Sequence, residues 1–472
     1  MRRWIIGGVL LAMALFVGSR NYIADHGQEY LQEVLDSYNR GQEDLHLELS
    51  SYDGGWSGAE ARIRVRLGAG TAQIEGVRDP LILKFRVEYG PLVGGWHPGL
   101  IRLRSAGSFS RWLEAKSSRS FLELVPKDIR YRYDGWVGWW HTMHERIRLS
   151  RIDAYDQESR ERLILEPVEI RDDYALSSQR GRAEFVSKAA IFVNGKSAER
   201  VEISHPRLNA VVDEFNPKGF YFGSIGFSVR EIRMRMTGAH PHTLRFSGAV
   251  NAALRHQAPD LATFELKTEG KALNSGTSRE WEGLEALQLR LRVESLGIGG
   301  IEKLLAMEKE RQKIREELAR AVGKKDDIAM QKAILALQAL DNGWIDAYNA
   351  LLLPGRTHLV FDETLKGEKR SHLHLELTFT GQKLPDDPFR AMVALTTGMD
   401  RLAEGRFDLA VEARLLARMA PQGKIILDSM VQKGLASLKE GVYRFTGELR
   451  KGKIIIHGTR YAPQELIMMI LM

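Results

Sequence analysis

The chain of 472 residues contains no cysteine. It therefore has no disulfide, no thiolate metal site, no iron–sulfur cluster and no cysteine nucleophile. Hydrophobic residues make up 44% of the chain and charged residues 27%, and proline occurs only 14 times. These fractions are close to those of globular proteins, so they exclude a disordered chain, a collagen and a polytopic membrane protein.

Motifs of known catalytic chemistry are also missing. The sequence has no Walker loop, no G-x-S-x-G elbow and no H-E-x-x-H. Residues 297–300 read Gly-Ile-Gly-Gly, but Glu302 occupies the third glycine position of a dinucleotide fingerprint, so we expect only a tight turn there. The histidine pair His141 and His144 lacks a third metal ligand nearby. We therefore expect no enzymatic activity, no metal and no cofactor.

Charge of one sign is in only slight excess. The formal net charge is +7, with 68 Lys and Arg against 61 Asp and Glu, and the arginines recur on the wet faces of many predicted strands. A nucleic-acid site would gather its basic residues on one surface. We therefore expect no nucleic-acid partner, and favour lipid phosphates or lipopolysaccharide for any basic surface.

One long apolar run is present, at the N-terminus. Arg2 and Arg3 precede the run Trp4–Gly18, which spans roughly 22 Å as a helix. The run is short for a bilayer crossing, and a cleaved signal peptide or an uncleaved anchor would both fit it. Its end fits a signal peptidase poorly, so we favour an anchor over residues 1–20 with a cytoplasmic N-terminus. A helix over 21–41 follows, either as a juxtamembrane spacer or packed on the body.

Beyond residue 42 the hydrophobic period becomes two. Apolar and charged residues alternate in the segments 61–67, 83–88, 232–236, 287–294 and 372–379. Such alternation is typical of antiparallel strands with one buried and one solvated face. We therefore predict an α+β protein, mostly antiparallel β, with an N-terminal transmembrane helix, long amphipathic sheets and one inserted helical hairpin.

The helical hairpin interrupts the strands. Helical spacing of apolar residues over 300–322 and 328–352, with a stop between them, predicts two antiparallel helices. We expect this hairpin, at 297–354, to cover part of a sheet. It separates a β-rich body at 42–296 from a β-rich C-terminal part at 355–472.

Several short motifs carry a family resemblance. The sequence Ser-Tyr-Asp-Gly-Gly-Trp-Ser-Gly-Ala at 51–59, Tyr-Gly-Pro-Leu at 89–92 and the C-terminal segments at 433–435, 443–445 and 453–458 are similar to motifs of the YdgA-like bacterial family, a domain of unknown function. His457 stands where that family's closing hairpin usually has asparagine. The resemblance implies a single anchor in the inner membrane of a Gram-negative cell and a periplasmic β-rich body, and it assigns no catalytic residue.

Two hypotheses for function follow from these features. The first is a non-enzymatic scaffold or binding protein of the cell envelope, anchored in the bilayer through residues 4–18, with an envelope protein as partner and a homo-oligomer left open. The alternative is a lipid- or hydrophobe-binding or transfer protein whose apolar strand faces form a trough. The residues of that trough would be Leu287, Leu289, Leu291, Val293, Leu373, Leu375, Leu377 and Phe379.

A dense aromatic cluster lies within the predicted β-rich body at 42–296. Trp136, Trp139 and Trp140 fall within five residues. Tryptophan is favoured at bilayer interfaces, so the cluster is a candidate for contact with lipid headgroups. Such clusters more often belong to a core, and we favour that interpretation.

Overall fold

A computed structural model provides the fold of the chain. It describes residues 16–469 apart from a set of short segments. The segments not described are 40–44, 57, 68–80, 94–96, 109–128, 156–159, 196, 198, 217–219, 238–241, 277–283, 325, 382, 388–389, 392, 394–402, 463–464 and 467. Most of the apolar run at 4–18 therefore lies outside the described residues.

The chain forms two compact units, Met1–Gly223 and Ser224–Met472. Each consists mainly of antiparallel strands, which confirms the predicted class of mostly antiparallel β with a few helices. The division falls inside the segment 42–296 that the sequence pattern treats as one body. The period of two is the same on both sides of residue 223, so alternation alone does not mark the division.

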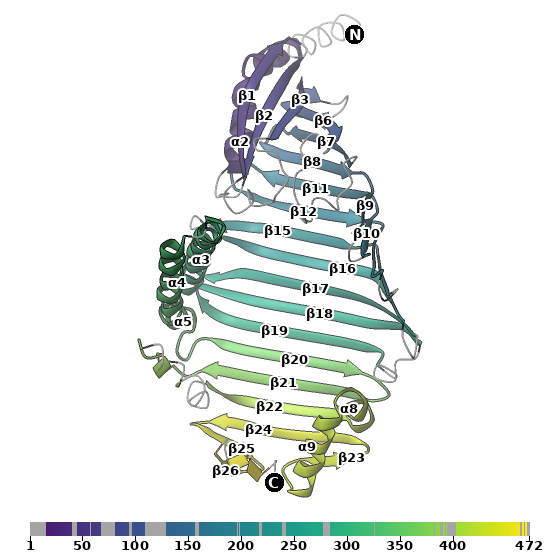
Figure 1. The fold of residues 1–472 in the computed structure, drawn as a ribbon, viewed down its shortest axis with the longest axis vertical. Helices are drawn as coiled ribbons and strands as arrows, with labels where there is room; N and C mark the ends of the chain where they lie inside the picture. The colour runs from purple at the N-terminus through teal and green to yellow at the C-terminus, as the bar shows by residue number, and fades with distance from the viewer. Residues whose placement is uncertain are drawn as a thin grey trace, which may run out of the picture. The chain divides into compact units, whose positions relative to one another are not determined.

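The first unit contains one described long helix and fifteen strands, shown in Figure 1. They are α2 (Gly27–Asn39), β1 (Leu45–Gly55), β2 (Gly58–Leu67), β3 (Leu81–Tyr89), β4 (Leu92–Val93), β5 (His97–Pro98), β6 (Ile101–Ser108), β7 (Arg130–Val137), β8 (Thr142–Leu149), β9 (Ile152–Tyr155), β10 (Arg162–Leu165), β11 (Val168–Ala175), β12 (Arg180–Ser187), β13 (Ala189–Val193), β14 (Arg200–Ser204) and β15 (Arg207–Asn216). Antiparallel pairing runs through β1, β2, β3, β6, β7, β8, β11, β12 and β15 in that order.

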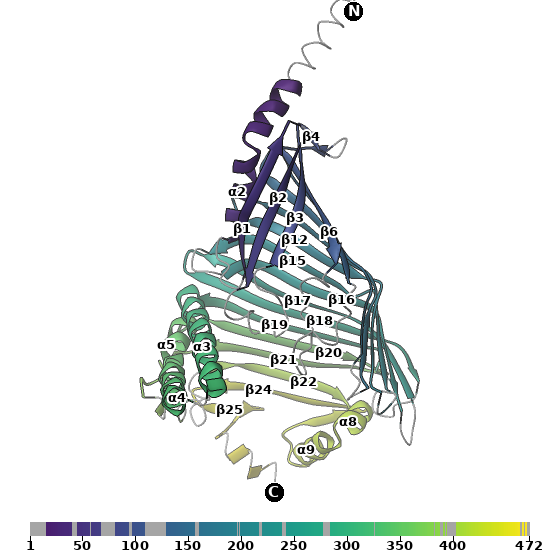
Figure 2. The same cartoon turned by 45° about the horizontal axis from the view of Figure 1, so that its top comes forward.

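A sealed core holds α2 against this sheet. Leu31, Val34 and Leu35 recur at helical spacing and are buried against strand residues such as Ile63 and Val87. Figure 2 shows α2 lying along β1. The helix expected over 21–41 is thus packed on the first unit's own sheet, which was one of the two alternatives.

Eleven strands and five helices of the second unit are named among its described residues. They are β16 (Phe220–Met236), which starts just before the division, β17 (His242–Ala258), β18 (Leu261–Gly276), β19 (Ala286–Gly297), α3 (Ile298–Lys324), α4 (Asp327–Asn342), α5 (Trp344–Leu351), β20 (His358–Lys366), β21 (Arg370–Phe379), β22 (Ala403–Glu412), α8 (Ala413–Met419), α9 (Pro421–Gln432), β23 (Ser437–Lys439), β24 (Val442–Arg450), β25 (Lys453–Ile456) and β26 (Thr459–Tyr461). Antiparallel pairing runs through β17, β18, β19, β20, β21, β22, β24, β25 and β26 in that order.

The helices between β19 and β20 lie at the ends of strands. Figures 1 and 2 both show α3, α4 and α5 beside one end of β17–β20 and not across the middle of the sheet. The second predicted helix is broken at Gly343 into α4 and α5. Gly300 lets the start of α3 approach the end of α5, because a Cβ atom there would lie 2.3 Å from the backbone nitrogen of Leu351. The hairpin therefore meets the sheet at the ends of these strands and leaves their middle without a helix of the described chain over it.

No helix within the described residues is long and apolar enough to cross a bilayer. Residues 16–25 are helical. The first part of this segment, 16–18, is the end of the apolar run that the sequence predicts as an anchor.

Candidate hydrophobic binding site

The predicted trough residues come together on one face of the second unit's sheet. In an antiparallel pair, residues directly opposite each other project to the same side. The register pairs Leu291 of β19 with Phe361 of β20, and Phe361 with Leu375 of β21. The two predicted sets, on β19 and β21, are therefore joined through β20.

The same face extends across seven strands in four cross-strand rows, which we call the apolar strip. Each of the first three rows crosses β17, β18, β19, β20, β21, β22 and β24 in that order: the first is Leu254, Phe264, Val293, Leu359, Leu377, Gly405 and Leu449, and the second is Ala252, Leu266, Leu291, Phe361, Leu375, Phe407 and Gly447. The third row is Val250, Thr268, Leu289, Glu363, Leu373, Leu409 and Phe445. The fourth row ends on β21 and is Gly248, Gly270, Leu287, Leu365 and Ser371. At about 4.8 Å between strands, the strip is roughly 29 Å across.

Most of the strip is neither sealed nor fully exposed. All seven predicted trough leucine and valine residues on β19 and β21 are half-buried. In the first unit, by contrast, Ala61 and Ile101 on equivalent alternating positions are fully buried beneath a covering layer. Half-burial of this kind is expected where neighbours on the sheet touch a side chain and no element of the described chain is packed over it.

Phe379 is the exception among the predicted residues. It is only 8% exposed and packs with Ile345, Leu384 and Ala391 in a small sealed cluster at the end of β21. Its ring lies 6.1 Å from that of Tyr348 on α5, nearly perpendicular to it. Phe379 is thus a core residue and not part of an open trough.

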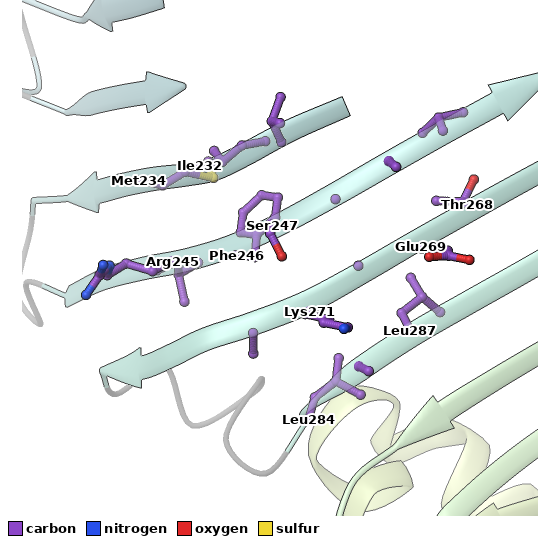
Figure 3. Close-up of a pocket in the computed structure, with 18 of the residues that line it drawn as sticks. Ile232, Met234, Arg245, Phe246, Ser247, Thr268, Glu269, Lys271, Leu284 and Leu287 are labelled. Atoms are coloured by element: carbon purple, nitrogen blue, oxygen red, sulfur yellow. The ribbon is translucent and has the colours of Figure 1, made fainter. Parts of the chain in front are cut away.

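A cavity of about 570 Å³ lies on this face over β16–β19. Its accessible surface is almost wholly apolar, and Figure 3 shows Ile232, Met234, Phe246 and Leu287 around it. Arg245, Glu269 and Lys271 also border it. Volumes of 300–1,000 Å³ are typical of sites for small organic ligands. The cavity is therefore large enough for part of a lipid chain.

Two glycines form the floor of the cavity. Gly248 on β17 and Gly270 on β18 are directly paired, and Gly270 is also paired with Leu287. A Cβ atom at Gly270 would meet no atom closer than the carbonyl oxygen of Ser247 at 3.9 Å. The hollow exists because two neighbouring strands lack side chains at paired positions, so a larger side chain at Gly270 would fill it.

Most of this cavity lies outside the trough predicted from the alternating residues. The predicted trough residues lie on β19 and β21, whereas the cavity lies mainly over β16, β17 and β18. A signal is present in the sequence, since Gly248 and Gly270 both lie at apolar-face positions of strands. Only the register shows that they are neighbours.

The opposite face of the same sheet is charged. Arg290 lies 2.7 Å from Glu265 in an ion pair, and Arg406 lies 2.8 Å from Glu376. Burial alone would raise the pKa of Glu265, but hydrogen bonds from Lys267 and Arg290 bring it below its ordinary value. The two sides of the sheet thus differ sharply in polarity, as the alternation predicts.

The strip is closed at its C-terminal end. Leu427 and Met430 of α9 are buried together with Val411, Tyr443 and Leu466 in a second cluster. Leu409 and Phe445, the last members of the third row, pack against that cluster. The open part of the strip therefore lies between the cavity and β22.

The tryptophan cluster lies in the first unit. Trp136 on β7 is half-buried and stacks on His144, with ring centroids 4.9 Å apart. Trp139 and Trp140 lie in the turn before β8 and are 41% and 85% exposed. A core position is therefore wrong for Trp139 and Trp140, because the turn carries them away from the sheet.

The histidines that could suggest a metal site are paired with carboxylates. His144 lies 2.6 Å from Asp173, and His374 lies 2.6 Å from Asp362. In the part of the chain that the structure describes, no group of three or more His, Asp or Glu side chains is placed to hold a metal ion.

Comparison of the chain with models of protein families, with characterised proteins and with solved structures found no match.

Proposed function

We propose that this protein binds the apolar chain of a lipid or similar amphiphile along the apolar strip, with the cavity over β16–β19 as the principal site. This is the second of the two functional hypotheses, and it is non-enzymatic. The observation that carries it is the pairing of Gly248 with Gly270 beneath a cavity of about 570 Å³ on a half-buried apolar face. A chain can fill such a hollow, whereas a flat protein surface would leave it empty.

The size of the strip fits this ligand. Its width of roughly 29 Å is close to the hydrocarbon thickness of a whole bilayer, about 30 Å, so it exceeds the length of one acyl chain. Each methylene group that leaves water for such a surface contributes about 0.8 kcal/mol. Exposed apolar patches of this kind mark binding sites more often than they serve stability.

We further propose that the chain is anchored in the inner membrane through residues 4–18, with its body in the periplasm. Trp56, at the turn between β1 and β2, is 61% exposed and donates a hydrogen bond of 2.6 Å to Asn21. The guanidinium carbon of Arg20 lies 4.8 Å from the Trp56 ring. An arginine just after an apolar run, with an exposed tryptophan beside it in space, is typical of the membrane–water interface.

Photo-crosslinking of the full chain in membranes tests the binding proposal. A long-chain alcohol that carries a diazirine would be irradiated with the protein, and labelled peptides mapped by mass spectrometry. We expect labelling of β16–β20, and a severalfold loss of it in Gly270→Leu, whose side chain fills the cavity. Gly299→Leu is the matched control, because no atom lies within 4 Å of a Cβ at that position.

Two results would contradict the proposal. One is a folded wild-type protein that takes up no label on the second unit. The other is crosslinking of two copies through β17–β20 by a bifunctional reagent in a parallel experiment, which would assign the strip to self-association. The membrane proposal is tested separately, by fusing a reporter that is active only in the periplasm after Met472; activity only of a cytoplasmic reporter would refute it.

A further inference from the structure

One charged side chain lies on the apolar strip. Among the positions that strand pairing places on this face of β17–β22 and β24, Glu363 is the one Asp, Glu, Lys or Arg. It lies in the third row between Leu289 and Leu373, and it is half-buried. Within the described part of the chain, its carboxylate makes no hydrogen bond or ion pair.

The position of Glu363 differs from that of the other acidic residues on this sheet. Asp362, its neighbour on β20, points to the charged face and is hydrogen-bonded to His374. Lys366, at the end of the same strand, pairs with Glu285 at 2.8 Å. A carboxylate that is partly withdrawn from water among leucines, without a cation, is costly unless something neutralises it.

Glu363 lies outside the cavity lining, on the strand next to that of the lining residue Leu287. In the third row it is two strands from Thr268, which lines the cavity, so the two backbones are about 10 Å apart. The Thr268 hydroxyl also has no partner among the described residues. A chain lying in the cavity over Gly270 could therefore end beside Leu289, between a hydroxyl group and a carboxylate.

We propose that the ligand is a long-chain amphiphile whose polar end carries an ammonium group, and that Glu363 binds that group. This inference rests on the proposed function of the strip. A carboxylate only accepts hydrogen bonds and carries negative charge, so it favours a cationic donor and repels a fatty acid. Thr268 can donate or accept, so it suits the neutral or anionic atoms next to the ammonium group.

Three probes of equal chain length test the charge preference. Each carries the same diazirine, and their ends are an ammonium, a hydroxyl and a carboxylate. With the full chain in membranes, we expect the ammonium probe to label β16–β20 at about tenfold lower concentration than the carboxylate probe. In Glu363→Gln this ratio should fall to nearly one, while labelling by the hydroxyl probe stays unchanged. Asp362→Asn, the same change on the other face, should keep the wild-type ratio.

The outcomes separate this inference from the proposed function. If no probe labels the strip, the proposed function itself fails. If the hydroxyl probe labels it but the ammonium preference is absent, or survives in Glu363→Gln, the strip binds chains and Glu363 does not select them. A thermal melt of each variant confirms that it is folded.

The ammonium group has two chemical sources, a free long-chain amine or a zwitterionic phospholipid. A two-chain phospholipid probe with a primary ammonium headgroup distinguishes them from each other. Equal or better labelling than by the single-chain amine identifies the phospholipid, and a loss of labelling identifies the amine. Replacing that headgroup by a trimethylated one removes the N–H donors, and we expect it to weaken labelling severalfold.

Discussion

Replacing Asp172 by asparagine should stabilise the first unit at neutral pH. Asp172 on β11 is directly paired with Glu145 on β8, so two carboxylates face each other on the side of the sheet that packs against α2. Glu145 accepts hydrogen bonds from Tyr38 of α2 and Tyr133 of β7. Burial raises the pKa of Glu145, and burial together with the charge of Glu145 raises the pKa of Asp172 to about 6. Asparagine resembles the protonated acid in shape and carries no charge.

The sign and size follow from that pKa. The ordinary value of an aspartate is about 3.9, so between roughly pH 4 and pH 6 the folded chain holds a proton that the unfolded chain has lost. The free energy of unfolding therefore falls as pH rises through this window, and it stays lowered above it. A shift of about two units corresponds to at most about 3 kcal/mol, and partial exposure of the side chain reduces this to about 1–2 kcal/mol.

Urea unfolding of the full chain between pH 4 and pH 8 measures the effect. The gain in Asp172→Asn over wild type should be small at pH 4, grow to pH 6 and stay constant above pH 7. Asp173→Asn is the control with the opposite sign. Burial opposes its ionisation, but hydrogen bonds from His144 and Arg182 hold the pKa of Asp173 below its ordinary value, so its replacement should lose stability at neutral pH. A gain for Asp172→Asn that does not vary with pH, or a loss at pH 8, would refute the reasoning.

Three further substitutions probe the second unit. Gly300→Ala should lower the unfolding free energy by about 1–3 kcal/mol because its Cβ meets the α5 backbone; Gly299→Ala, with open space around it, should not, and equal melting temperatures would contradict this close contact. Leu466→Ala should cost about 2–4 kcal/mol in urea unfolding, since Leu466 is buried in the C-terminal cluster; an unchanged midpoint would mean that the tail is not docked. Leu375 is half-buried, so a carboxylate there can still reach water, and Leu375→Asp should keep a native far-ultraviolet circular dichroism spectrum. The same variant should reduce labelling by the long-chain alcohol. A variant that unfolds would indicate a sealed core.

Alternation in the sequence predicted the strands well because its physical cause is local. Each side chain on a strand points to the opposite side from its neighbour. In a sheet with one solvated face, polar and apolar residues therefore alternate along each strand. The segments 61–67, 83–88 and 287–294 all lie in strands of the structure, and the apolar members of 287–294 share one face. No pairing information was needed for this.

The cavity could not be predicted in the same way because it depends on register. Gly248 and Gly270 are 22 positions apart in the sequence. The residues around either glycine do not indicate that the two are paired across neighbouring strands. A slip of one residue would place one of them on the charged face and remove the hollow. The position of α3, α4 and α5 at strand ends likewise depends on close approaches such as that of Gly297, at the end of β19, to the backbone of Ala350 in α5. The spacing of apolar residues along the sequence gives no information about such contacts.

An open apolar face raises the question of what holds its strands together. On the charged side, Arg290 and Glu265 link β19 to β18, and Arg406 and Glu376 link β22 to β21. Single surface ion pairs contribute little, but these lie beside continuous backbone pairing along strands of up to 17 residues. The sealed clusters around Phe379 and under α9 cover the ends of the strands at two places. The backbone ladder and the sealed strand ends thus stabilise the sheet, with a small contribution from the charged face, so the middle of the apolar face need not be buried for the sheet to fold and would be available to the ligand that we propose.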